Sequence, residues 1–367
     1  MRLMFRIQIA AGLLLATVAA GGVPTTAQAV PIGGRSVITA ENASRTAGFS
    51  TTVPASSGTC TEVRLPVAFA AGRPKDAILA GTLCRPVQWA AGPRTVDVLV
   101  HGGMYNRQYW DWPVRPEVYS YARRTVQAGR AAFYYDRFGA GTSTRPPGPQ
   151  ASFANDVYGL HQVVSWLKET YPRVNSIGHS LGSVVVMKEA GQFQDPDRVV
   201  LTGLTHGHGL GFLLLPTTIY TALLDPQFAD VQLLDGAYLT TLPGKRKELF
   251  YSASAEPDVI AWDEAHKDVM TASQASPAIY QLTLPPLLNW SNQITAPVLM
   301  VVGQQDAPFC NVDVSCAGDL MLTAAELPYF TGASSFTART VPDTGHDLPL
   351  HPSAGTSFAM IDSWLGS

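Results

Sequence analysis

The chain has 367 residues, of which 46% are hydrophobic and 14% are charged, and its formal net charge is −3. This composition is too apolar and too weakly charged for a disordered chain, and the length fits one large domain or two smaller ones. No basic stripe is present, and we expect the densest positive run, Lys245-Arg246-Lys247, to be a solvated face. The composition therefore argues against a nucleic-acid-binding protein.

The start of the chain, residues 1–29, has the pattern of a secretory signal peptide. Arg2 and Arg6 precede an apolar run over residues 7–20, and Ala27-Gln28-Ala29 then supplies a cleavage site. Because a membrane-spanning helix needs about 20 apolar residues, this run is too short for a stable membrane anchor. We expect cleavage after Ala29 and secretion of the mature chain.

Export changes the interpretation of the four cysteines. Cys60 and Cys84 lie in consecutive strand-like runs, and Cys310 and Cys316 enclose a short loop. Four cysteines permit three connectivities, and an oxidising compartment favours disulfide bonds. We predict the two sequence-local pairs, Cys60–Cys84 and Cys310–Cys316. A zinc site would need closer Cys-x-x-Cys spacing with nearby His ligands, so no metal is expected.

Strand-like and helix-like segments alternate after a lead-in, residues 30–58, that we expect to be extended or disordered. The predicted strands are 62–70, 77–84, 95–101, 130–136, 174–178, 199–204, 296–303 and 335–341, and the predicted helices are 117–128, 154–170, 181–190 and 356–365. Alternating strands and helices form right-handed crossovers and a parallel sheet, whereas the first two strands, joined by a short turn, would pair antiparallel. The sequence thus predicts an α/β fold with a mostly parallel sheet flanked by helices.

One long segment, residues 205–292, interrupts this alternation between two of the predicted strands. It is rich in Leu and Pro and contains an apolar run over residues 210–224. Because the segment is too long for an ordinary loop, we expect an insertion with its own helices. The apolar run would form either the core of this insertion or an apolar wall for a substrate group.

A G-x-S-x-G motif, Gly178-His179-Ser180-Leu181-Gly182, lies between a predicted strand and a predicted helix. In this context the motif places a serine on a sharp turn above the edge of a parallel sheet. The glycines let the backbone pass close to its neighbours, and N–H groups at the start of the helix can stabilise an oxyanion. Ser180 is therefore the candidate nucleophile, while His179 is expected to pack against the sheet.

A nucleophilic serine needs a base that takes its proton and an acid that orients the base. Asp306 follows the predicted strand 296–303, and His346 follows the predicted strand 335–341. Catalytic groups of parallel sheets gather at the carboxyl ends of the strands, so both residues lie where a triad requires them. We predict that Ser180, His346 and Asp306 act together.

Other residues compete for two of these roles. Asp313 and Asp343 are alternative acids, but Asp343 is very close in sequence to His346, and Asp313 lies inside the loop between two cysteines. His351 is an alternative base, but it lies at the start of the closing helix. Asp306 and His346 therefore stay the preferred assignments.

Four sequence features together resemble a known superfamily. They are His101-Gly102-Gly103, the run Asp136-Arg137-Phe138-Gly139-Ala140-Gly141-Thr142-Ser143, the elbow at Ser180, and the positions of Asp306 and His346. Over residues 60–366 the chain resembles the lipase- and esterase-like branch of the α/β-hydrolase superfamily. The resemblance implies an eight-stranded sheet with the segment 205–292 as a cap. It also implies an oxyanion hole formed by the N–H of Leu181 and that of Gly103 or Met104.

Serine at the elbow, in place of aspartate, excludes reactions that need an alkyl-enzyme ester and leaves acyl transfer. We expect a secreted serine hydrolase acting on a small-molecule carboxylic ester or lactone with an apolar group, and His206, Phe212 and Leu214 are the candidate pocket residues. A peptidase, an amidase or an acyltransferase would use the same triad, and a non-catalytic binding protein is a remote alternative. No cofactor is expected, because Gly139-Ala140-Gly141 lacks the G-x-G-x-x-G pattern of nucleotide sites. Nothing in the sequence indicates the oligomeric state.

Overall fold

The computed structural model describes residues 51–232 and 235–366. The predicted signal peptide, residues 1–29, and the first part of the lead-in lie outside the described residues. The described end of the lead-in is held against the fold, because the N–H of Thr52 donates to the carboxylate of Asp111 over 3.0 Å. This contact argues against disorder at residue 52; the prediction for residues 30–50 lies outside the described residues. Within the described ranges no helix has the length and apolarity to cross a membrane.

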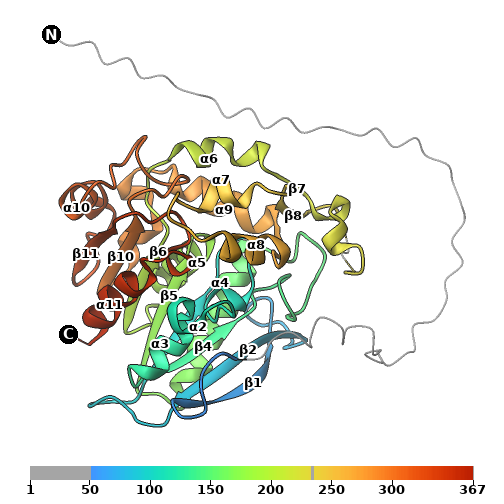
Figure 1. The fold of residues 1–367 in the computed structure, drawn as a ribbon. Helices are drawn as coiled ribbons and strands as arrows, with labels where there is room; N and C mark the ends of the chain where they lie inside the picture. Colours follow the sequence, from blue (N-terminus) through green and yellow to red (C-terminus); the bar gives the residue numbers. More distant parts are fainter. Residues whose placement is uncertain (1–50, 233–234, 367) are drawn as a thin grey trace, which may run out of the picture. The chain divides into compact units, whose positions relative to one another are not determined.

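The central element is an eight-stranded sheet with the strand order β1-β2-β4-β3-β5-β6-β10-β11 (Figure 1). Its strands are β1 (Gly58–Val67), β2 (Ala77–Pro86), β3 (Thr95–Val100), β4 (Ala131–Tyr135), β5 (Arg173–His179), β6 (Arg198–Thr202), β10 (Val298–Gly303) and β11 (Phe336–Val341). β2 pairs antiparallel with β1 and with β4, and the other neighbours are parallel. The predicted eight strands, mostly parallel with an antiparallel opening pair, are confirmed.

Helices cover both faces of this sheet, which explains why its central strands are continuous apolar runs. Alternate residues of β3 point to opposite faces: Val98 packs into one core with α4 and α5, and Leu99 packs into the other core with α3 and α11. The helices outside the insertion are α2 (Pro116–Tyr119), α3 (Tyr121–Gln127), α4 (Phe153–Lys168), α5 (Leu181–Phe193), α10 (Asp319–Glu326) and α11 (Ala354–Leu365). The carboxyl ends of the parallel strands are therefore held between two packed layers of helices.

Ser120 divides the helix that was predicted over residues 117–128 into α2 and α3. It has an extended backbone, with φ −86° and ψ 109°, and its hydroxyl accepts a hydrogen bond from the N–H of Arg123. The same hydroxyl donates to the buried carboxylate of Asp111 over 2.7 Å. A serine that caps the second helix thus ends the first one.

The insertion between β6 and β10 holds a small sheet as well as the predicted helices. Its helices are α6 (Leu210–Leu214), α7 (Arg246–Phe250), α8 (Pro257–Ala265) and α9 (Ala272–Leu282), and α9 packs against α4 and α5. Strands β7 (Ile219–Thr221), β8 (Tyr238–Thr241) and β9 (Met270–Thr271) form an antiparallel sheet. These strands are two to four residues long, too short for their alternation to show in the sequence.

Both disulfide bonds have the predicted connectivity. Cys60 bonds to Cys84, its direct partner in the β1–β2 ladder. Cys310 bonds to Cys316 and closes a loop that follows β10. All four cysteines are therefore bonded, and none is a free thiol.

Candidate active site

Ser180 lies on the turn between β5 and α5, where the predicted elbow requires it. Its backbone is strained, with φ 51° and ψ −121°. A Cβ on Gly182 would lie 2.3 Å from the carbonyl oxygen of Val100, and one on Gly178 would lie 2.5 Å from the Cα of Ser183. Both positions of the motif therefore require glycine, because any side chain would collide with backbone.

The loop that follows β3 passes directly beside the elbow. A Cβ on Gly102 would lie 3.2 Å from the Cβ of Ser180. Gly103, Met104 and Leu181 line the same cavity as Ser180, and Met104 has a positive φ of 60°. The structure thus brings together the three predicted oxyanion donors, with Leu181 in the first turn of α5.

Arg137 holds this loop in place, a role that the sequence motif did not reveal. Its buried guanidinium donates to the carbonyl oxygens of His101 over 3.1 Å and Gly102 over 2.9 Å, and it pairs with Asp156 over 2.6 Å. The Nε2 atom of His101 accepts from the N–H of Arg137 over 3.0 Å. Burial, and then the charge of Arg137, lower the pKa of His101 well below its ordinary value, so the ring stays a neutral acceptor.

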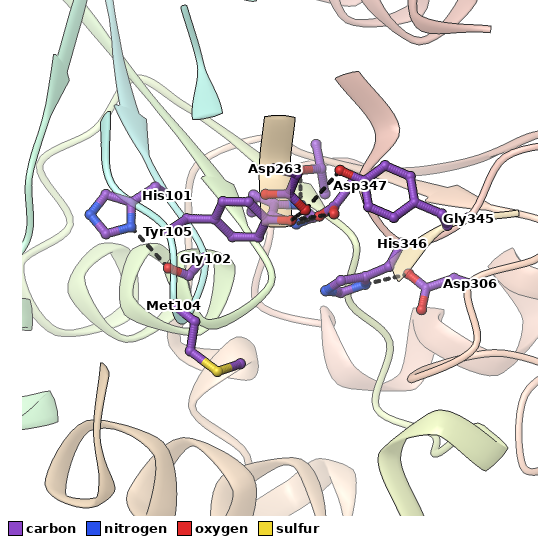
Figure 2. A network of polar contacts seen from close by, with 12 residues as sticks. His101, Gly102, Met104, Tyr105, Asp263, Asp306, Gly345, His346 and Asp347 are labelled. Carbon is purple, nitrogen blue, oxygen red and sulfur yellow. Dashed lines mark hydrogen bonds and ion pairs between the residues drawn. The ribbon is translucent and has the colours of Figure 1, made fainter. Parts of the chain in front are cut away.

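His346 and Asp306 form a buried pair at the ends of β11 and β10. The Nδ1 atom of His346 lies 2.9 Å from an oxygen of Asp306 (Figure 2), and the other oxygen of Asp306 accepts from the N–H of Phe309. Burial would lower the pKa of His346, but the charge and hydrogen bond of Asp306 raise it above its ordinary value of 6.5. The pair can therefore orient the imidazole and stabilise its protonated form.

The alternative acids and the alternative base lie elsewhere. Asp343 is exposed, and Asp313 pairs with His208, with 3.0 Å between Nδ1 and the carboxylate. The Nε2 atom of His351 accepts from the N–H groups of Ser252 over 3.0 Å and Gly345 over 3.1 Å, so this ring holds the loop that carries His346. Both sets of contacts favour the preferred assignments.

A buried polar network, which the sequence did not predict, lies beside His346 (Figure 2). The hydroxyl oxygen of Tyr105 lies within hydrogen-bonding distance of the carboxylates of Asp347 and Asp263, and its single proton can be donated to one of them at a time. Arg246 pairs with Asp263 through two hydrogen bonds of 2.8 and 2.9 Å, and its guanidinium lies 4.2 Å from the centre of the Tyr105 ring. The expected solvated face at Lys245-Arg246-Lys247 is wrong for Arg246, which is fully buried because Asp263 compensates its charge.

His179 packs as predicted and joins this network. Its ring stacks on Tyr109, with 4.4 Å between ring centres, and its Nε2 atom lies 3.1 Å from Asp347. Burial, and then the neighbouring His346, lower the pKa of His179 well below its ordinary value. The neutral, buried ring of His179 therefore anchors the residue before Ser180 to Tyr109 and Asp347.

Ser180 and His346 both line one cavity that opens to solvent. No hydrogen bond between the described residues joins the Ser180 hydroxyl to the His346 ring; the two side chains are related by lining the same cavity. The insertion supplies most of the apolar lining, with Phe212, Leu215, Phe250, Met270, Ala275, Ala278, Ile279 and Leu282. None of the residues described as lining it carries a full charge, apart from the titratable His346.

Phe212 lines the cavity as predicted, but His206 and Leu214 do not. The ring of His206 is buried against Tyr329 at 3.8 Å between ring centres, and its Nδ1 atom lies 2.6 Å from Glu326. Leu214 is 47% exposed. Residues three apart share one helix face, so Phe212 and Leu215 face the cavity while Leu214 points to solvent.

Comparisons with known proteins agree with this architecture. A model of the "Alpha/beta hydrolase family" matches residues 98–357. Among solved structures, an esterase from Thermogutta terrifontis covers 83% of this chain and 98% of its own, with 17% identity and a TM-score of 0.54. The 2-hydroxy-6-oxo-6-phenylhexa-2,4-dienoate hydrolase from Rhodococcus sp. strain RHA1 covers 84% and 99%, with 14% identity and a TM-score of 0.52.

A monoacylglycerol lipase from Paleococcus ferrophilus covers 79% of this chain and 98% of its own, with 16% identity and a TM-score of 0.52. No curated protein matches the sequence. At these identities the solved structures establish the fold alone, whereas the family model spans most of the chain. The chain belongs to the alpha/beta hydrolase family.

Proposed function

We propose that this protein is a secreted serine hydrolase that cleaves a carboxylic ester or lactone with an apolar group. The observation that carries the proposal is the position of Ser180, on a strained elbow that shares a cavity with His346, whose ring is bonded to Asp306. Its membership of a hydrolase family supports the general reaction. The two disulfide bonds support an oxidising, extracellular compartment.

In the proposed reaction the Ser180 oxygen attacks the carbonyl carbon, and Nε2 of His346 takes the hydroxyl proton. Asp306 keeps the proton on Nδ1 and stabilises the imidazolium that forms. His346 then gives its proton to the leaving alcohol, and an acyl-enzyme remains. Water, activated by the same imidazole, releases the acid and regenerates Ser180.

The developing oxyanion would be held by backbone donors. The N–H of Leu181 and that of Gly103 or Met104 are the proposed groups, since all three residues line the cavity. Removal of one such donor typically lowers the rate by about 10²–10³-fold. Arg137 acts on these donors as a positioning residue, because it fixes the carbonyl groups of the loop.

The lining of the cavity supports a neutral, apolar substrate group. A charged acyl group would lose its water there and gain no oppositely charged partner, which is costly. An alkyl or aryl group would be buried against the side chains of α9 and α6. Peptidase, amidase and acyltransferase activities use the same triad and stay alternatives.

The test is a panel of p-nitrophenyl esters of graded chain length, with a lactone, an anilide and an added alcohol acceptor, together with a fluorophosphonate probe. We expect labelling of Ser180 and the fastest turnover on apolar esters. Faster turnover of the anilide would favour an amidase, and ester formation with the alcohol would favour an acyltransferase. Folded protein that shows neither labelling nor turnover would favour a binding role.

Phe212→Ser is expected to change the preferred chain length of the ester. Burial of one methylene contributes about 0.8 kcal/mol, so loss of contact with two or three carbons lowers kcat/KM about ten-fold or more. We expect this loss on p-nitrophenyl hexanoate, with little change on p-nitrophenyl acetate. Leu214→Ser is the matched control, because this leucine lies outside the lining. Equal loss on both esters with a lower Tm would place Phe212 in the core of the insertion instead.

The two disulfide bonds are expected to differ in what they support. The two disulfide bonds close loops with sequence separations of 24 and 6. For these loops the chain-entropy model gives stabilisation of about 3.5 and about 2 kcal/mol. The N–H of Cys310 donates to the carbonyl oxygen of Asp306 over 2.9 Å, so the second bond braces the loop of the proposed acid.

Replacing Cys60 and Cys84 by Ser should lower the free energy of unfolding more, with kcat largely kept. Replacing Cys310 and Cys316 by Ser should lower kcat more than stability. Denaturant unfolding and ester kinetics on both double variants check this difference. An unchanged kcat after loss of the Cys310–Cys316 bond would contradict it.

A further inference from the structure

Three side chains, from α4, from α5 and from the loop that follows α5, converge at a place that the proposed reaction does not use. His161 lies on α4, Glu189 on α5, and Asp195 just after α5. Their ligating atoms lie within 4.8 Å of one another, and Nδ1 of His161 is 2.8 Å from an oxygen of Asp195. At 1.5 Å per helical residue, Glu189 is about 13 Å along α5 from Ser180, so this cluster is separate from the candidate active site.

Glu189 is the unusual member of this cluster. Its side chain is fully buried, and no N–H or hydroxyl group of the described residues donates to either of its carboxylate oxygens; one oxygen of Asp195 also lacks a donor. Burial, and then a hydrogen bond to Asp195 and the charge of Asp195, raise the pKa of Glu189 well above its ordinary value, while the charge of Lys168 acts in the opposite direction. Two facing carboxylates in such a place need a positive charge between them, which is either a proton or a metal ion.

We propose that His161, Glu189 and Asp195 bind one divalent transition-metal ion of the zinc class. An imidazole nitrogen with two carboxylates is a donor set for zinc, whereas calcium and magnesium prefer oxygen ligands alone. Zinc holds such donors at about 2.0–2.2 Å, which places them about 3.5 Å apart in a tetrahedron. The observed separations, 2.8 Å between His161 and Asp195 and at most 4.8 Å among all three ligating atoms, bracket this value. The side chains of His161 and Asp195 are 28% and 15% exposed, so water can reach the cluster as a fourth ligand.

Binding would exchange a proton for the metal. The carboxyl group of Glu189 would release its proton to solvent, and His161 would ligate through Nδ1 with its remaining proton on Nε2. The ion would join α4 to α5 at the end of α5 remote from Ser180. Thiolates would not compete for it, because all four cysteines are bonded to one another.

Titration of chelator-treated, tag-free protein with zinc chloride in a calorimeter tests the proposal. We expect one ion per chain, and a rise in Tm of about 5 °C at a free zinc concentration of 100 times Kd. Glu189→Gln keeps the shape of the side chain but removes its charge, and should weaken zinc binding about 100-fold or more. His208→Gln is the control, because it removes an imidazole from the exposed pair with Asp313 and should leave binding unchanged.

Two outcomes would overturn the proposal. If the wild-type protein binds neither zinc, manganese nor nickel, the carboxylates share a proton, and Glu189→Gln should then raise the Tm without any metal. If zinc binds Glu189→Gln as tightly as it binds the wild type, the ion lies elsewhere, for instance at His346. Neither result depends on whether the protein hydrolyses esters.

Discussion

Ser180→Ala is expected to lower kcat/KM for ester hydrolysis by about 10⁵-fold or more, because it removes the atom that would form the acyl-enzyme. The free energy of unfolding should change little. Alanine must adopt the same backbone with φ 51°, so the strain at the elbow is equal in both proteins. The loss therefore belongs to the reaction and not to the fold.

The measurement is steady-state kinetics with fluorophosphonate labelling, on protein shown to be free of contaminating esterase. Ser176→Ala is a matched control. This serine lies on β5 just before the elbow, is fully buried, and its hydroxyl has no hydrogen-bond partner among the described residues. It should therefore keep activity and labelling. Activity close to wild type in Ser180→Ala would mean that another residue is the nucleophile.

Asp306→Asn is expected to lower kcat by about 10⁴-fold, the size of effect that follows when the acid of such a triad no longer fixes the tautomer of its histidine. Asp343→Asn and Asp313→Asn are the matched controls, because neither carboxylate contacts His346. A larger loss in Asp343→Asn than in Asp306→Asn would show that the acid is misassigned.

The pH profile gives a second, independent result for Asp306→Asn. His346 must be neutral to accept the proton of Ser180, so kcat/KM rises with pH through the pKa of His346. Because Asp306 raises this pKa above 6.5, the acidic limb of the wild-type profile should have its midpoint above pH 6.5. Loss of the carboxylate should move that midpoint to lower pH while the maximal rate falls. A midpoint that does not move would mean that the limb reports another group.

The sheet was predictable because its signal is local. Strands such as β3 and β10 are apolar along their whole length, since both faces of the sheet are covered, and turn residues mark their ends. Topology then places residues that follow parallel strands at one edge. This rule alone was enough to bring Asp306 and His346 together beside the elbow, although they lie 40 residues apart.

The contacts of the insertion were not predictable from the sequence. They join residues that are distant in the chain, and the residues next to each of them in sequence do not indicate its partner. Arg246 lies in a basic run and looks solvated until Asp263 is brought beside it by the packing of α7 on α8. The orientation of Leu214 depends on where α6 begins, and a shift of one residue would have placed it in the cavity. His206 follows a strand end as Asp306 does, yet its ring is bonded to Glu326 and does not line the cavity. Glu326 lies on α10, a helix that was not predicted.

The hydrogen-bonded path from Arg246 through Asp263 and Tyr105 to Asp347 has a consequence for how the protein unfolds. It connects helices of the insertion to the loop after β3 and to the residue beside His346. Arg246 and Asp263 both belong to the insertion, so detaching it would break the hydrogen bond between Tyr105 and Asp263. It would also separate Arg246 from Asp347, a buried carboxylate whose charge Arg246 partly offsets. We therefore expect the insertion and the sheet to melt as one cooperative unit, and the insertion to stay in place while this path is intact.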